Sequence, residues 1–185
     1  GLKSYVAHFF IRVDRVFRES YNGIKITRRR HMKKFFQIIL GISFLFLLVG
    51  CSSQETATFT QKTGGTDVTL VYTYDKKTDT VTKIKIETNE PAEHTEARKD
   101  NEKLFEEIKG IDGVVTSLTE KDGKLISSAE IDLTKYKFSK LKESNNYFFT
   151  GLVQSGFLTE DGDHASFSKS KEVALKRGMT EQTKK

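Results

Sequence analysis

Cys51 is the one cysteine of this chain of 185 residues. A deprotonated thiol is a strong nucleophile, so this side chain can take part in covalent chemistry. One cysteine forms no disulfide within its own chain, and a leftover cysteine in an exported protein needs a specific explanation. Covalent modification of the sulfur supplies that explanation, and the residues before Cys51 favour it.

The segment before Cys51 has the order of a secretory signal. Met32, Lys33 and Lys34 form a short positive n-region, and residues 35–49 form an apolar h-region. The positive end stays in the cytoplasm by the positive-inside rule. The apolar run is shorter than the ~20 residues that a permanent spanning helix needs, and no basic cluster follows it. We therefore expect a signal peptide over residues 32–50.

The residues at the end of this segment resemble the bacterial lipobox: Leu48, Val49 and Gly50, followed by Cys51. The resemblance implies that the sulfur takes a diacylglyceryl group from a phospholipid. It also implies that a signal peptidase cuts between Gly50 and Cys51. Two acyl chains, such as palmitate, give firm anchoring, whereas one chain is marginal. The alternatives are a buried cysteine at a helix end and an uncleaved membrane anchor.

Two groups of acidic residues with a histidine are candidates for a metal site. The first is Glu90, Glu93, His94 and Glu96, and the second is Asp161, Asp163 and His164. Zinc takes about four ligands, and acidic residues are also favoured at the start of a helix. A calcium loop needs several alternating oxygen ligands and a distant Glu, and apolar residues stand there instead. We interpret the groups as a helix start and a hairpin turn, and expect no metal or cofactor.

Hydroxyl and carboxyl side chains are plentiful, but they form no recognisable catalytic pattern. No serine lies in a nucleophile-elbow motif, and the one thiol is used by the lipid. Paired carboxylates can perform acid–base catalysis, yet the acids here lie in Lys-rich runs typical of solvated faces. The sequence predicts no enzyme.

The basic charge of the chain is unevenly distributed. The first 50 residues hold 10 of the 31 basic residues and 2 of the 25 acidic residues. The remainder therefore carries 21 basic and 23 acidic residues. Nucleic-acid binding needs a basic patch on the folded domain. The remainder is slightly acidic, so we expect no nucleic-acid partner.

Residues 1–31 precede a complete n-region. They are basic, and Phe9, Phe10, Val13 and Phe17 fall on a rough helical stripe. One interpretation is a long cytoplasmic n-region or a basic amphipathic arm. The one we favour is an upstream extension, with translation starting at Met32.

Alternating apolar and polar residues predict strands after the signal. The first three cover residues 57–62, 67–75 and 80–88, and short turns join them into an antiparallel meander. Pro91 ends this part. A second hairpin covers residues 114–133, and Asp122-Gly123 is its turn signal.

Helical spacing follows each set of strands. A helix starts near Glu93 and stops at Gly110, with Ala97, Leu104, Phe105 and Ile108 facing one way. Residues 148–157 have helical spacing, and a last helix covers 171–177, capped by Ser168 or Ser170 and stopped by Gly178.

These elements predict an α+β fold, with an antiparallel β-sheet packed against a few helices. We expect a short tether over residues 51–56, one domain over 57–180 and a flexible tail over 181–185.

Several motifs of this domain resemble the YehR-like family of small bacterial lipoproteins. They are Thr58-Phe59-Thr60, Val68-Thr69-Leu70-Val71-Tyr72-Thr73-Tyr74, Val81-Thr82-Lys83 and Gly110-Ile111-Asp112-Gly113-Val114. The resemblance covers most of residues 51–180 and implies the same α+β fold. It brings no activity and no catalytic residues, because the family has no known function.

The resulting hypothesis is a lipoprotein of the bacterial cell envelope, anchored at the extracytoplasmic face of the cell membrane through Cys51. Its partners are the lipoprotein-processing enzymes, the membrane and an envelope protein or ligand bound by the domain. The alternative is a small solute-binding component of a transporter, although such receptors have two lobes and this domain is small for that.

Overall fold

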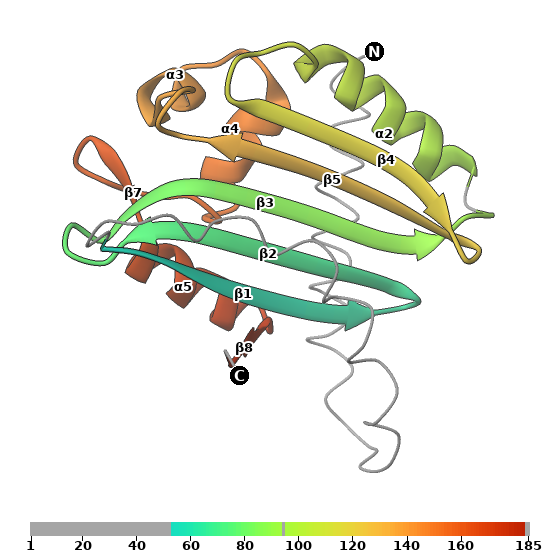
Figure 1. The fold of residues 1–185 in the computed structure, drawn as a ribbon, viewed down its shortest axis with the longest axis horizontal. Helices are drawn as coiled ribbons and strands as arrows, with labels where there is room; N and C mark the ends of the chain where they lie inside the picture. Colours follow the sequence, from blue (N-terminus) through green and yellow to red (C-terminus); the bar gives the residue numbers. More distant parts are fainter. Residues whose placement is uncertain (1–52, 94, 184–185) are drawn as a thin grey trace.

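A long antiparallel sheet dominates the computed structural model, which describes residues 53–93 and 95–183 (Figure 1). β1 (Gln54–Thr63), β2 (Thr66–Asp75) and β3 (Thr80–Pro91) form a meander. β4 (Val114–Lys121) and β5 (Lys124–Asp132) form a hairpin, and β5 pairs with β3. The strand order is β4-β5-β3-β2-β1-β8. The meander, its end at Pro91 and the second hairpin confirm the sequence prediction.

Side-chain alternation fixes which face of the sheet is buried. Phe59 pairs with Leu70, Leu70 with Ile86, and Ile86 with Ala129, so buried residues of four strands share one face. A slip of one residue would turn every one of these side chains toward the opposite face, so burial sets the register. At the hairpin tip, Asp122 and Gly123 both have positive φ, as a type I′ turn requires.

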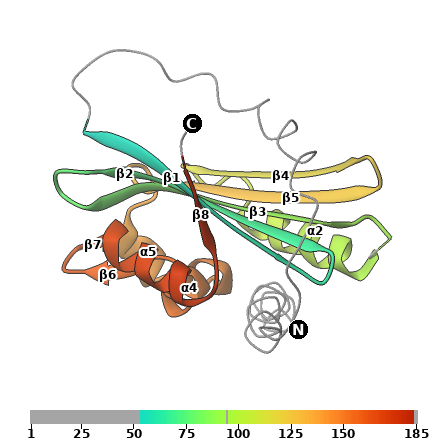
Figure 2. The same ribbon diagram turned by 90° about the horizontal axis from the view of Figure 1, so that it is seen from below.

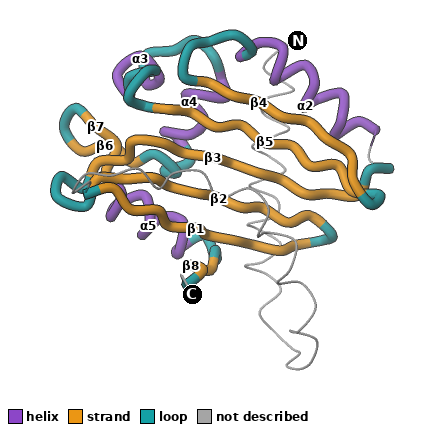
Figure 3. Tube along the Cα trace, viewed as in Figure 1, coloured by secondary structure: helices purple, strands orange, loops and turns teal. Residues whose placement is uncertain are grey.

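The four described helices contribute to the core on this face, which we call the helix face, and Figure 2 shows α2, α4 and α5 on this side of the strands. They are α2 (Thr95–Ile108), α3 (Phe138–Lys142), α4 (Tyr147–Gln154) and α5 (Phe167–Lys176). In Figure 3, α2 runs along β4 and α5 lies near β1. This is the α+β fold that the sequence predicts.

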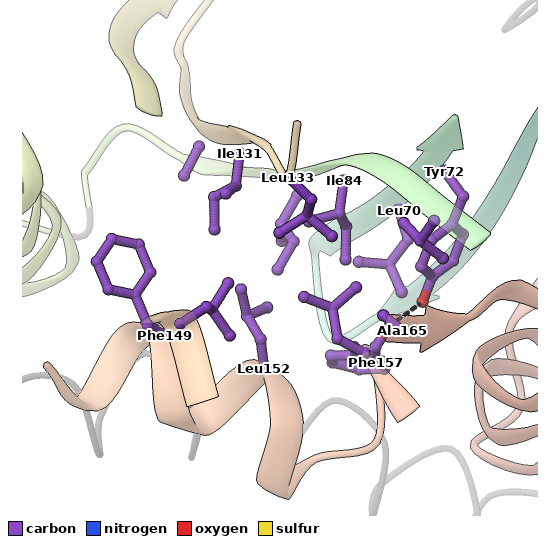
Figure 4. Close-up of a cluster of buried hydrophobic side chains, with 14 of the residues drawn as sticks. Leu70, Tyr72, Ile84, Ile131, Leu133, Phe149, Leu152, Phe157 and Ala165 are labelled. Atoms are coloured by element: carbon purple, nitrogen blue, oxygen red, sulfur yellow. Dashed lines mark hydrogen bonds between the residues drawn. The ribbon is translucent and has the colours of Figure 1, made fainter. Parts of the chain in front are cut away.

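Aromatic and aliphatic side chains from sheet and helices form one core. Leu70, Ile84 and Ile131 point from the sheet toward Phe149 and Leu152 of α4 (Figure 4). Each fully buried side chain of this kind stabilises the fold by about 1.5–3 kcal/mol. The buried Tyr72 hydroxyl donates a hydrogen bond of 2.8 Å to the carbonyl oxygen of Phe157, which ties β2 to the chain after α4.

The start of α5 differs from the prediction. The helix begins at Phe167, and its cap is Ser166, whose Oγ accepts from the backbone N–H of Lys169 at 3.2 Å. Ser168 and Ser170 do not cap it: the Ser168 hydroxyl donates to Asp79, and the Ser170 hydroxyl donates to the carbonyl oxygen of Ser166. The partner of Ser168 is distant in sequence, so a local sequence pattern does not reveal it.

A small hairpin precedes α5. β6 (Thr159–Asp161) pairs with β7 (His164–Ser166), and Asp161 faces His164 across the turn. β7 also pairs with β3 at Thr80. The hairpin turn predicted at Asp161-Gly162 is confirmed.

Both ends of the described domain are more ordered than predicted. β1 begins at Gln54, so residues 54–56 of the expected tether belong to the sheet. Glu181 and Gln182 of the expected tail lie in β8 (Thr180–Gln182), which pairs with β1. The Gln182 amide donates to Thr60 Oγ1 at 2.7 Å. The chain-end residues in these strand pairings, 54–56 and 180–182, are polar, so an apolar pattern does not predict them.

Candidate functional site

The residues predicted to carry the lipid signal lie outside the described part of the chain. They are Lys33, Lys34, Leu48, Val49, Gly50 and Cys51. Among the described residues, no helix is long and apolar enough to span a membrane. The structure does place Ser53, two residues after Cys51.

Ser53 is bound to the end of β2. Its hydroxyl donates a hydrogen bond of 2.5 Å to Asp75 Oδ2, and its carbonyl oxygen accepts from the backbone N–H of Lys76 at 2.8 Å. The hydrogen bond from Ser53, and then those from Thr78 and Lys77, hold the pKa of the Asp75 carboxyl below its usual range. The chain is therefore fixed to the β2–β3 turn from Ser53 onward.

Glu55 adds a second connection at this end of the sheet. One of its carboxylate oxygens pairs with the Lys76 ammonium at 3.0 Å, and the other accepts from the Tyr74 hydroxyl at 3.0 Å. Burial, and then the neighbouring Glu55, raise the pKa of Tyr74 to about 12. Tyr74 also stacks on Phe167 at a ring distance of 3.6 Å, so the start of β1 is linked to the start of α5.

A cluster around Asp79 lies at the same end. Asp79 has a φ of 55° in the β2–β3 turn, and its carboxylate accepts from the hydroxyls of Ser166 and Ser168 at 2.5 and 2.7 Å. It also accepts from the backbone N–H of Ser168. Partial burial acts to raise the pKa of Asp79, but these hydrogen bonds outweigh it and lower the pKa. The serines donate to a carboxylate, and this arrangement fastens α5 to the turn.

The two metal-site candidates do not come together. Glu90 is buried near the end of β3, whereas His164 lies in β7 beside the start of β3. Ten strand residues separate these positions by roughly 33 Å. His164 Nδ1 is 3.3 Å from Asp163 Oδ1, and His94 lies outside the described residues. No group of three or more His, Cys, Asp or Glu suited to a metal ion occurs among the described residues.

A row of buried polar residues lies on the helix face and was not predicted from the sequence. Gln61, Thr88 and Ser127 occupy one row across β1, β3 and β5, and all three are buried. The Gln61 amide donates to the carbonyl oxygen of Arg177, and the Asn101 amide of α2 donates to Ser127 Oγ at 2.8 Å. The sequence does contain a signal for this row, because these polar residues occupy inward-facing positions of predicted strands.

The opposite face of the sheet is the broadest surface that the described helices leave uncovered, and we call it the open face. Its rows carry ion pairs between Lys83 and Glu130 at 3.1 Å and between Lys85 and Glu87 at 2.9 Å. Threonines and serines fill much of the remainder: Thr56, Thr58, Thr60, Thr69, Thr73, Ser117, Thr119 and Ser128. The open face is polar and can offer hydrogen bonds to a partner.

The chain belongs to the family described as a protein of unknown function (DUF1307), whose model matches residues 55–180. It is similar to "Uncharacterized lipoprotein Lin0239" of Listeria innocua, with 30% identity over 71% of this chain and 90% of that protein. It is also similar to "Uncharacterized lipoprotein Lmo0207" of Listeria monocytogenes, with 29% identity over 70% of this chain and 88% of that protein.

Two solved structures have a similar fold. The Escherichia coli YehR protein aligns with a TM-score of 0.51 and 22% identity over 69% of this chain and 90% of that chain. A protein from Streptococcus pneumoniae TIGR4 aligns with a TM-score of 0.53 and 15% identity, over 85% of this chain and 98% of that chain. The resemblance to YehR-like lipoproteins of unknown function is thus confirmed.

Proposed function

We propose that this protein is an exported lipoprotein, held at the extracytoplasmic face of the cell membrane by a diacylglyceryl group on Cys51. The observation that carries the proposal is where the folded domain starts. Ser53, which is held by hydrogen bonds, is two residues after Cys51, and the first residue of β1, Gln54, is three residues after it. A cut between Gly50 and Cys51 therefore leaves every described strand intact. The two Listeria relatives named as lipoproteins support the same assignment.

The domain itself acts, in this proposal, as a non-enzymatic interaction module of the cell envelope. The polar open face supports this role, because interaction surfaces commonly combine hydrogen-bonding groups with scattered apolar ones. The hydroxyls at Asp79 support a structural role, since their acceptor is a carboxylate with a lowered pKa, which is a weak base for activating a hydroxyl.

A small solute-binding component of a transporter is the alternative. Receptors of that kind hold their ligand between two lobes. The described domain is built on one sheet with one hydrophobic core, which favours the interaction module.

The lipid is tested by replacing the sulfur. Cys51→Ala should abolish acyl transfer and the cut after Gly50, because lipidation bonds to the sulfur itself. Wild-type protein should partition almost wholly with membranes, since each buried methylene contributes roughly 0.8 kcal/mol. Mass spectrometry of the mature N-terminus should show the lipid mass on Cys51 in the wild type and not in the variant.

Ser53→Ala is the matched control. It alters a neighbouring side chain without removing the thiol, so the lipid mass and the membrane fraction should stay unchanged. Wild-type protein with an unmodified Cys51 in the soluble fraction would contradict the proposed anchor.

A further inference from the structure

The distance between the proposed lipid and the folded body is set by covalent geometry. Ser53 is bound to Asp75 and Lys76, so only Ser52 separates Cys51 from a fixed position. The Cα atoms of Cys51 and Ser53 are at most about 7 Å apart, since a residue spans at most ~3.6 Å. A lipid on Cys51 therefore keeps the start of β1 next to the phospholipid headgroups.

Several described elements meet at this end of the sheet. β1 starts here, the β2–β3 turn formed by residues 76–79 lies beside it, and Asp79 holds the start of α5. Figure 1 shows this turn and β7 at one end of the strands, and the β1–β2 and β4–β5 turns at the other. The ten residues of β1 separate the two ends by roughly 33 Å.

We propose that the end carrying the β2–β3 turn, which we call the anchored end, rests on the headgroups, with the strands extending away from the bilayer. This orientation rests on the proposed lipid at Cys51. Lys77 is exposed in the turn. Its ammonium has no ion-pair partner among the described residues, so in this orientation it is available to the headgroup phosphates. Lys76, by contrast, is paired with Glu55.

The open face is poorly suited to lie flat on the bilayer. A surface-bound segment buries a continuous apolar face among the lipids. On the open face, Val71 and Val115 share a row but are separated by Lys85 and Glu130. The end-on orientation leaves this face and the β4–β5 turn accessible to partners.

The orientation is tested with the lipidated full-length protein in phosphatidylcholine vesicles that contain nitroxide-headgroup lipid. Three variants carry one added thiol each for a fluorophore: Lys77→Cys at the anchored end, Lys121→Cys at the opposite end, and Ser117→Cys on the open face. We expect quenching at position 77 to exceed that at 121 and 117 by at least about fivefold, given the length of the strands. All three positions are exposed, and circular dichroism checks that each variant is folded.

Quenching at position 121 or 117 equal to that at 77 would overturn the end-on orientation. The unsubstituted protein separates this result from failure of the anchor. If Cys51 carries the lipid, the unsubstituted protein takes up no thiol-reactive dye. Labelling of Cys51 would refute the lipid itself and, with it, the basis of the orientation.

Discussion

Asp79 connects two parts of the chain that are 87 residues apart in sequence. Its carboxylate accepts hydrogen bonds from the hydroxyls of Ser166 and Ser168 and from the N–H of Ser168, beside the positive end of α5. Because these bonds favour the charged form, the pKa of Asp79 is lowered in the folded protein in spite of partial burial. The charged carboxylate thus stabilises the fold.

This contribution should depend on pH. A lowered folded pKa gives stability that is complete above the unfolded value, about 3.9, and is lost as pH falls through the folded value. Asp79→Asn keeps a residue that tolerates positive φ but removes the charge. We expect a loss of about 1 kcal/mol in the free energy of unfolding at pH 7, after solvent screening, and a smaller loss near pH 3.

Urea unfolding at the two pH values measures the effect. Asp122→Asn is the matched control, since Asp122 also has a positive φ, of 52°, and lies exposed in a turn. It should change the free energy of unfolding little at either pH. An equal loss for both variants would argue against the Asp79 hydrogen bonds.

Tyr72 is a second single residue that contributes to the stability of the fold. Burial raises the pKa of its hydroxyl, so Tyr72 stays protonated and donates to Phe157. Tyr72→Phe should lower the free energy of unfolding by about 1–3 kcal/mol, because the buried carbonyl loses its donor. Tyr136→Phe, at a half-buried tyrosine packed on Phe149, should cost much less in the same urea experiment.

At the scale of elements, the loop between α2 and β4 is held against the end of β5. The carbonyl oxygen of Gly113 accepts from the N–H of Asp132 at 2.7 Å. A Cβ on Gly113 would meet Lys135 Cβ at 2.8 Å and the Tyr136 nitrogen at 3.0 Å, whereas a Cβ on Gly110 would meet nothing within 4 Å. The two glycines have φ values of 86° and 78°, so they differ mainly in this close approach.

These two positions form a matched pair of variants. Gly110→Ala should lower the free energy of unfolding by about 1–2 kcal/mol through backbone strain alone. Gly113→Ala should lower it by about 2–5 kcal/mol, because overpacking adds to that strain. Thermal or urea unfolding measures both. Equal losses would mean that the contact with Lys135 and Tyr136 relaxes without cost.

The sequence predicts elements that repeat a pattern over several turns or strand residues, and misses those that depend on distant partners. The long strands and α2 follow alternation or helical spacing, and α2 buries Leu104, Phe105 and Ile108 as expected. α3 has five residues, too few to establish a period, and was not predicted. The cap of α5 depends on Asp79, and β8 depends on Thr60, so neither appears in a local window.

At the scale of the whole molecule, stability should come from the hydrophobic core without a metal. The candidate ligand Glu90 lies near the end of β3, whereas His164 lies in β7 beside the start of β3. Adding EDTA or zinc to the purified protein should leave its melting temperature unchanged within roughly 1 °C, because only a bound metal shifts the folding equilibrium. A fall of several degrees with EDTA would contradict this expectation.

The lipid site at Cys51 stays a prediction from the sequence. Cys51 stands out by its order after an apolar run, which is a linear pattern that a sequence displays fully. The fixation of Ser53 to Asp75 could not be predicted, because it pairs residues 22 positions apart. The open face could not be predicted, because it depends on the side of the sheet on which the helices pack.

The position of β1 also decides how the domain responds to mechanical force. A lipid at Cys51 and a partner at the β4–β5 turn would pull along the strands, with the load entering at Ser53. β1 is paired with β2 over ten residues, from Gln54 to Thr63. A pull along the strand axis shears these pairs together, whereas a pull across the sheet would open them one after another. With the lipid and the partner that we propose, a pull along the strands would load all the pairs of β1 and β2 together, so the domain should resist unfolding under such tension.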